Sequence, residues 1–149
     1  MKAATASAWN QHALSVLERT GHRSSAPRAA VVGALAELGC SATAREIADL
    51  LEQRDDRVGV ASIYRTLELL ERLRLVQRFD IGENTARYEP ALPGGEHHHH
   101  LVCDRCGGVT PFEDEGLEHA IGRVADRVSF AIDGHDVTLR GLCPACRAG

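Results

Sequence analysis

The last third of the chain holds an unusual concentration of residues that bind transition metals. Four consecutive histidines, His97–His100, lead into a Cys-x-x-Cys pair at Cys103 and Cys106, and a second pair follows at Cys143 and Cys146. Each pair alone has too few ligands to close a tetrahedral site, whereas the two together supply the four thiolates of a structural zinc site. This part of the chain is therefore predicted to fold around Zn2+. Alternatively, the cysteine pairs could be redox dithiols or disulfides, and the histidine run could be an expression tag.

The composition leaves room for only thin apolar cores. The 149 residues are 44% hydrophobic but only 4% aromatic, which allows one domain or two small ones. Small units of this kind often depend on a metal or a dimer interface. Because the sequence has no apolar run of about 18 residues and no apolar signal core after Met1, we expect neither a membrane span nor a secretion signal. A cytoplasmic protein with reduced thiols is the expectation.

The charge is divided unequally along the chain. Residues 1–88 carry 12 Lys/Arg and 11 Asp/Glu, whereas residues 89–149 carry 5 and 10, within a net charge of −4. That net charge argues against a nonspecific coat on nucleic acid. The acidic second part would attract divalent cations. The first part is rich in arginine, which makes paired contacts to phosphate and guanine.

The first part of the chain predicts four helices. Apolar spacing marks residues 8–20, and a Ser-Ser-Ala-Pro start and a glycine stop bound a second helix over 24–38. A capping box over 43–46 opens a third helix. The fourth begins at Val60 and carries an apolar stripe through Leu73, with polar residues on the opposite face.

The pattern then changes to short strands. Strand-like runs over 75–81 and 86–88 flank a turn and predict a β-hairpin. Helices followed by a hairpin favour a winged helix-turn-helix, whose recognition helix enters the major groove of DNA, over a helical domain with an incidental hairpin. The Pro- and Gly-rich residues 90–95 predict a hinge. Beyond it we expect a helix over 114–128 and strands over 98–103, 108–112, 130–132 and 136–142.

The histidine run predicts two metal sites. In an extended strand, successive side chains point to opposite faces, so His98 and His100 share one face and His97 and His99 share the other. Each pair needs further ligands, and the candidates are Glu89 for the first pair and Glu118 with His135 for the second. A solvated histidine run is the alternative.

Three segments carry a resemblance to a known family: Ser25–Arg28, Val60–Leu67 and His97–Gly107. On these motifs the chain resembles the ferric uptake regulator family of bacterial metal-sensing repressors over essentially its full length. The resemblance implies a homodimer that binds double-stranded DNA at a near-palindromic operator. It also implies an α+β fold, with a winged helix-turn-helix domain over 1–89, a hinge over 90–96 and a small α/β dimerisation domain over 97–149.

The resemblance further implies roles for particular residues. The structural zinc would be held by Cys103, Cys106, Cys143 and Cys146. The sensory metal would be held by Glu89, His98 and His100, and an additional metal by His97, His99, Glu118 and His135. The residues that face DNA would be Tyr64 and Arg65, together with Ser62 and Arg28.

One loop departs from the family pattern. Many relatives have a histidine before the third helix, where this chain has Gly39-Cys40-Ser41. Cys40 is therefore a candidate fourth ligand of the sensory site, or else a small buried side chain. The carboxylate of Glu89 suits iron or manganese, whereas a set with Cys40 and two histidines suits zinc. We expect Fe2+ or Zn2+ as the regulatory metal.

The functional prediction is a metal-responsive repressor of metal-homeostasis genes. One alternative is a peroxide sensor of the same family, in which iron promotes oxidation of a histidine ligand. The other is a zinc hydrolase, which would need an open metal position and a nearby base. The sequence has no His-Glu-x-x-His or comparable catalytic spacing, so we predict that the protein is not an enzyme.

Overall fold

Contacts within the chain divide it into two units, Met1–Glu96 and His97–Gly149. The computed structural model describes residues 3–23, 25–82, 85–91 and 98–148. Each unit has helices and a three-stranded sheet of its own. The architecture is α+β, as the sequence predicts. No helix in the described part of the chain is both long and apolar enough to cross a membrane.

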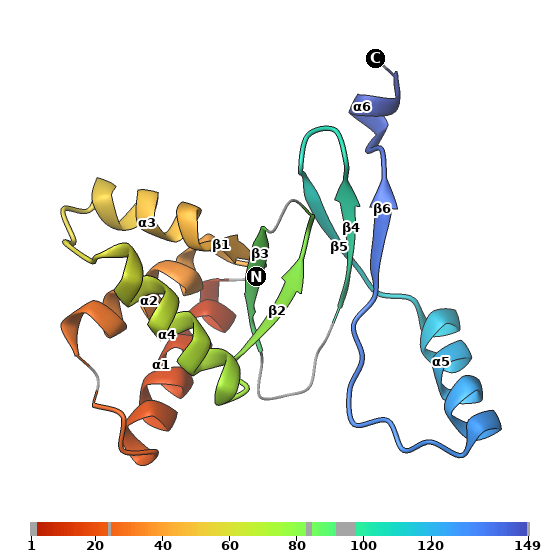
Figure 1. The fold of residues 1–149 in the computed structure, drawn as a ribbon, viewed down its shortest axis with the longest axis horizontal. Coiled ribbons are helices and arrows are strands. Elements are labelled where there is room, and N and C mark those ends of the chain that lie inside the picture. The colour runs from red at the N-terminus through yellow and green to blue at the C-terminus, as the bar shows by residue number, and fades with distance from the viewer. Residues whose placement is uncertain (1–2, 24, 83–84, 92–97, 149) are drawn as a thin grey trace. The chain divides into compact units, whose positions relative to one another are not determined.

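The N-terminal unit consists of helices followed by a small antiparallel sheet (Figure 1). Its elements are α1 (Ala3–Arg19), α2 (Ala26–Leu38), β1 (Ala42–Thr43), α3 (Ala44–Gln53), α4 (Val60–Arg72), β2 (Val76–Asp80) and β3 (Ala86–Pro90). The strands lie in the order β1-β3-β2. This is the expected arrangement of a winged helix-turn-helix, with α3 and α4 as the helix pair and β2–β3 as the wing.

Local signals explain where these helices begin and end. Pro27 lies in the first turn of α2, and the helix ends before Gly39, whose φ of 89° suits a residue without a side chain. The predicted capping box is present, because the Thr43 hydroxyl accepts from the Glu46 amide while the Glu46 carboxylate accepts from the Thr43 amide. The largest difference in extent is that of α1, which begins at Ala3 rather than at residue 8.

The apolar stripe of α4 is largely as predicted. Ile63, Leu67 and Leu70 are completely buried in the core of the N-terminal unit, and Leu73 packs against that core. Val60 is an exception, since it is 61% exposed. Val60 is exposed because it is the first residue of the helix, and the side chains of α4 enter the core only from Ile63 onward.

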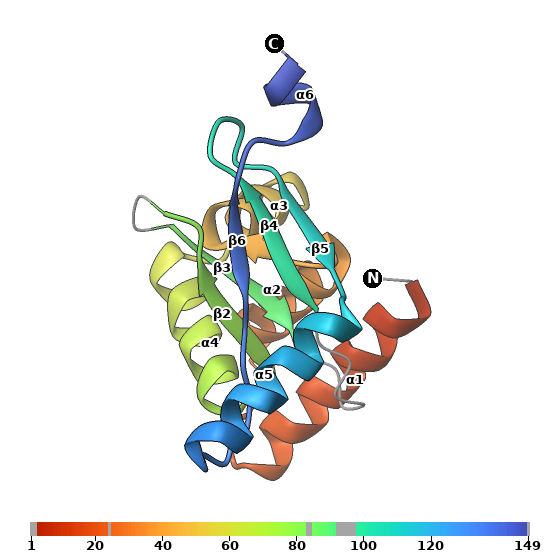
Figure 2. The ribbon, with the colours of Figure 1, turned by 90° about the vertical axis from the view of Figure 1, so that its right-hand side faces the viewer.

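The C-terminal unit is a three-stranded sheet with two helices (Figure 2). Its elements are β4 (His99–Cys103), β5 (Val109–Phe112), α5 (Glu115–Val128), β6 (Thr138–Gly141) and α6 (Pro144–Ala148). The strand order is β5-β4-β6, with β4 antiparallel to β5 and parallel to β6. The parallel pair requires a crossover, which α5 provides.

Three further features differ from the prediction, two in the C-terminal unit and one in the N-terminal unit. The strand predicted over 130–132 is absent, because α5 ends at Ser129 in a left-handed conformation and the chain continues as an irregular segment with Phe130 70% exposed. The two-residue strand β1 and the short helix α6 are not predicted by any periodicity. Of the predicted hinge, Pro90 is the last residue of β3, and residues 92–96 lie outside the described part of the chain.

Candidate metal centres and nucleic-acid interface

The four paired cysteines come together in the C-terminal unit. Their sulfur atoms all lie within 4.8 Å of one another, and Cys106 Sγ is 3.9 Å from Cys143 Sγ. The parallel pairing of β4 with β6 brings them together, because it sets Cys103 opposite Gly141, just before the second pair. None of the five cysteines, all of which are described, forms a disulfide. The donor set matches that of a tetrahedral zinc site.

Backbone amides stabilise one thiolate of this cluster in particular. The Cys143 amide donates to Cys103 Sγ at 3.4 Å, and with the amides of Cys106 and Arg105 it lowers the Cys103 pKa to about 6. The pKa of Cys146 is raised to about 12, first by its contact with the Cys143 thiol and then by burial. Four sulfurs this close cannot all ionise without a cation between them, so the cluster suits a divalent metal.

Arg105 is a residue of this cluster that sequence analysis misses. Its Nη1 donates to the carbonyl oxygen of Cys146 at 2.6 Å. The side chain thus links the turn of the first pair to the helix of the second, in addition to the sulfur contacts. Its only sequence signal is its position between Cys103 and Cys106.

A second ligand group forms where β4, α5 and the segment before β6 meet. His99 Nε2 is 2.7 Å from Glu118 Oε1, and His135 Nε2 is 3.0 Å from Glu118 Oε2. His99 is almost completely buried, and its ring centroid lies 5.2 Å from that of His135. One carboxylate therefore joins two imidazoles whose ring nitrogens, with its own oxygens, could bind one divalent ion. The fourth residue expected here, His97, lies outside the described residues.

His98 and His100 form a separate pair. Their ring centroids are 5.2 Å apart with an interplanar angle of 63°, and His100 is buried. His99 lies between them in the chain but contacts Glu118 instead. This separation is the one that alternation along a strand predicts. The other two residues expected at the sensory site belong to the N-terminal unit, where Glu89 is a buried residue of β3 and Cys40 lies at the bend between α2 and β1.

The outer face of α4 carries the residues expected to contact DNA. Tyr64 and Arg65 are both exposed, next to a half-buried Ser62. Arg65 Nη2 donates to Ser62 Oγ at 3.3 Å, which holds the guanidinium along the helix surface. Arg28 differs, because this half-buried side chain in the first turn of α2 donates to the carbonyl oxygen of Arg23.

Several known proteins are similar to this chain in sequence and in fold. Residues 19–140 match the ferric uptake regulator family. The chain is 35% identical over 105 residues to the ferric uptake regulation protein of Bacillus subtilis, with 70% of each chain covered. It is 40% identical over 98 residues to the protein of that name from Legionella pneumophila, covering 66% of this chain and 70% of the relative.

A solved structure extends the likeness to nearly the whole chain. The ferric uptake regulator of Helicobacter pylori, described as having three functional metal binding sites, superposes with a TM-score of 0.81 at 26% identity. The superposition covers 96% of this chain and 94% of that one.

Proposed function

The chain belongs to the ferric uptake regulator family of metal-responsive, DNA-binding transcription regulators, and from that premise we propose that it is a repressor switched by a divalent metal. Family members are regulators rather than enzymes, which removes the hydrolase alternative. We further propose that it acts in the cytoplasm on metal-homeostasis genes. The observation that carries the proposal is the division of ligands at the start of β4, where His98, just before the strand, pairs with His100, while His99 joins Glu118.

We assign the metals by the chemistry of each donor set. The four cysteines would hold a structural Zn2+, since four thiolates are soft ligands in tetrahedral number. His97, His99, Glu118 and His135 would hold an additional ion. The regulatory ion would be held by Glu89, His98 and His100, with Cys40 as the candidate fourth ligand. This set suits Fe2+ if Cys40 stays out and Zn2+ if it takes part. The three sites reported for the Helicobacter pylori relative support this number of sites.

The exposed apolar residues of the C-terminal unit support a homodimer. Leu101 and Leu139 are cross-strand neighbours on β4 and β6, and both remain more than 40% exposed. Within the described chain, α5 has no buried residue, although its sequence is amphipathic and Val128 is 60% exposed. Exposed apolar surface of this kind marks a protein interface. Because family members form dimers, we propose that a second copy of this chain covers it. A twofold dimer would present two copies of α4 to a near-palindromic operator.

The regulation we propose follows from where the sensory ligands lie in the chain. Glu89 ends the wing of the N-terminal unit, whereas His98 and His100 begin the C-terminal unit. A divalent ion held by all three would supply a bond across the hinge, which would favour one arrangement of the two α4 helices. In such a switch, the coupling free energy between metal binding and DNA binding is about 1–3 kcal/mol.

The test is reciprocity between the two ligands. Coupling requires that DNA raise the affinity for the metal by the same factor by which the metal raises the affinity for DNA. Mn2+ or Zn2+ would be titrated with and without saturating amounts of the DNA that the metal-loaded protein selects from a random pool. Equal metal affinities in the two titrations would contradict the proposed switch.

The matched variants separate the roles of His98, His99 and His100. His98→Ala and His100→Ala should abolish metal-dependent DNA binding, whereas His99→Ala should remove a different metal equivalent and leave the switch largely in place. If all three substitutions removed the same equivalent, the division of ligands at the start of β4 would be wrong.

A further inference from the structure

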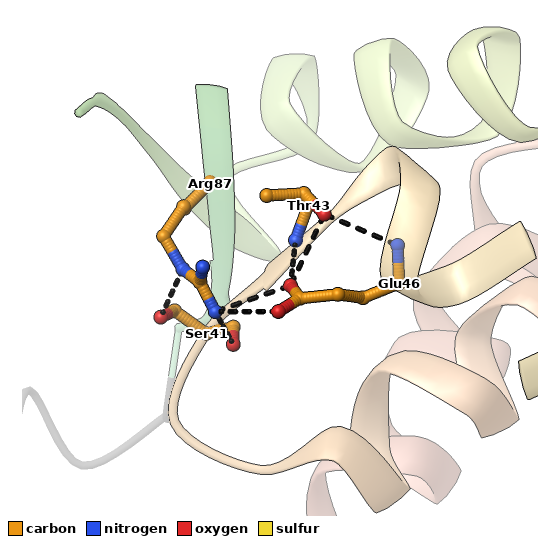
Figure 3. A network of polar contacts seen from close by, with 4 residues as sticks. All are labelled: Ser41, Thr43, Glu46 and Arg87. Atoms are coloured by element: carbon orange, nitrogen blue, oxygen red, sulfur yellow. Dashed lines mark hydrogen bonds and ion pairs between the residues drawn. The ribbon is translucent and has the colours of Figure 1, made fainter. Parts of the chain in front are cut away.

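An arginine of the wing is directed into the helix-turn-helix rather than toward solvent. Arg87, in β3, has only 14% of its side chain exposed, whereas Arg78 on the neighbouring strand β2 has 43% exposed. Arg87 Nε donates to Ser41 Oγ at 3.0 Å, and its Nη2 donates to the Ser41 carbonyl oxygen at 3.0 Å (Figure 3). The same Nη2 lies 3.1 Å from Glu46 Oε2. One guanidinium thus binds three acceptor groups, which are the Ser41 hydroxyl, the Ser41 carbonyl and the Glu46 carboxylate.

The carboxylate that Arg87 contacts is already part of the cap of α3. Glu46 Oε2 accepts from the Thr43 amide at 2.7 Å, and the Glu46 amide donates to Thr43 Oγ1 at 3.1 Å. Thr43 in turn pairs with Arg87 in the sheet. We call Ser41, Thr43, Glu46 and Arg87 the Arg87 network. It joins the segment after α2, the first turn of α3 and the wing strand β3. Only the planar fork of arginine can serve all of these acceptors at once.

Two members of this network, Arg87 and Ser41, lie close in the chain to a proposed ligand of the regulatory site. Arg87 is two residues before Glu89 in β3, so both side chains belong to the same face of that strand. Ser41 directly follows Cys40. On the other side of the network, α3 packs against α4, which carries Tyr64 and Arg65. The network is therefore a polar connection between the end of the wing that carries Glu89 and the helix pair.

We propose that Arg87 is a positioning residue that couples occupation of the regulatory metal site to the orientation of α4. The inference rests on the proposed function, because it requires Glu89 to be a metal ligand. A restraint placed on β3 at Glu89 reaches α3 through the contacts of Arg87 with Ser41 and Glu46. Without these contacts, β3 can move relative to α3, and the metal loses part of its influence on DNA binding.

The quantity that tests the proposal is a ratio of DNA affinities. The ratio divides the Kd for DNA without added metal by the Kd with saturating Mn2+ or Zn2+, using DNA selected by the wild-type protein. For the wild type we expect a ratio of roughly 5 to 150. Arg87→Met should lower it by at least about twofold, toward a ratio of one. Arg78→Met is the matched control, since it also removes a wing arginine but one paired with the exposed Asp80, and its ratio should stay within about twofold of wild type.

Further variants separate positioning from simple stabilisation. Arg87→Lys keeps the charge opposite Glu46 but cannot also hold both oxygens of Ser41, so it should recover most of the thermal stability without recovering the ratio. Glu46→Gln keeps an acceptor for the Thr43 amide but removes the charge, and it should lower the ratio in the same direction. If Arg87→Met does not fold, Glu46→Gln provides the test of the proposal in its place.

The outcomes distinguish this inference from the function on which it rests. If the wild-type ratio is about one, the proposed metal switch itself fails. If the wild type responds to metal and the folded Arg87 and Glu46 variants respond equally, the network is only structural and the inference is overturned. A full rescue of the ratio by Arg87→Lys would likewise overturn it, because charge alone would then suffice.

Discussion

The two units of this protein bury different kinds of residue. The N-terminal unit closes around apolar side chains, with Trp9, Leu35 and Leu67 completely buried. In the described part of the C-terminal unit, the buried residues are Val102, Cys103, His99 and His100, so three of the four are candidate metal ligands. The N-terminal unit is therefore stabilised by its own apolar core, whereas we expect the C-terminal unit to depend on the proposed metal and on the proposed second copy of the chain.

The largest effect should come from removing the zinc that we propose for the four-cysteine site. Cys103→Ser, or chelation of the metal, should unfold β4–β6 while α1–α4 remain protected, because binding at such sites contributes about 10–16 kcal/mol to folding. Hydrogen exchange resolved along the chain measures this directly. Cys40→Ser is the matched control, since it removes a thiol outside the cluster and should leave β4–β6 protected even if it weakens the proposed regulatory site. Unchanged protection of β4 in the chelated protein would show that the C-terminal unit does not need its zinc.

The opposite perturbation should affect only the N-terminal unit. Leu67→Ala empties a fully buried position and should cost about 2–5 kcal/mol of the free energy of unfolding of that unit. Zinc content and dimerisation should not change. Urea unfolding followed by the fluorescence of Trp9, which is the only tryptophan, reports on this unit alone. The exposed Leu38→Ala is the control, and simultaneous loss of zinc would mean that the units are not energetically separate.

A charge on the exposed apolar face should dissociate the dimer without unfolding the unit. Leu139→Arg places a cation on the outer face of the sheet, and we expect the dimer dissociation constant to rise by at least about tenfold, since a buried unpaired charge costs several kcal/mol. Sedimentation equilibrium measures the change. Val60→Arg adds the same charge to an exposed valine of the N-terminal unit and should leave the dimer intact. An unaffected dimer in Leu139→Arg would place the interface elsewhere.

The smallest effect is a pH dependence confined to the N-terminal unit. Burial raises the pKa of Tyr88, with Arg78 opposing the shift. Because the folded pKa lies above the unfolded value of about 10, Tyr88 stabilises the fold below that pH and loses the contribution as the pH rises further. Tyr88→Phe should flatten the decline in stability above about pH 10. An identical alkaline decline in both proteins would assign it to other groups.

Much of the N-terminal unit could be predicted because its signals are local. The proline in the first turn of α2, the capping box of α3 and the spacing of Ile63, Leu67 and Leu70 each act over one or two helical turns. The strand predicted over 130–132 fails for the converse reason. Its apolar residues resemble a strand in the sequence but have no neighbouring strand with which to pair.

Other features depend on pairing between distant segments. The strand β1 is only two residues long and exists because Thr43 and Ala42 pair with β3, more than forty residues away. The Arg87 network depends on the same pairing, and nothing around Arg87 in the sequence distinguishes it from the neighbouring wing arginine Arg78. Its role becomes visible only from its contacts with Ser41 and Glu46.

The sequence by itself determined the kinds of ligand and the alternation of His98, His99 and His100, because residue type and strand geometry are local properties. Tertiary structure decided which ligands meet. The pairing of β4 with β6 brought two cysteine pairs together, and packing of α5 set Glu118 between His99 and His135. The physical reason is that distant segments converge only when the whole unit folds, so the groups that meet there are fixed by packing and not by spacing in the chain.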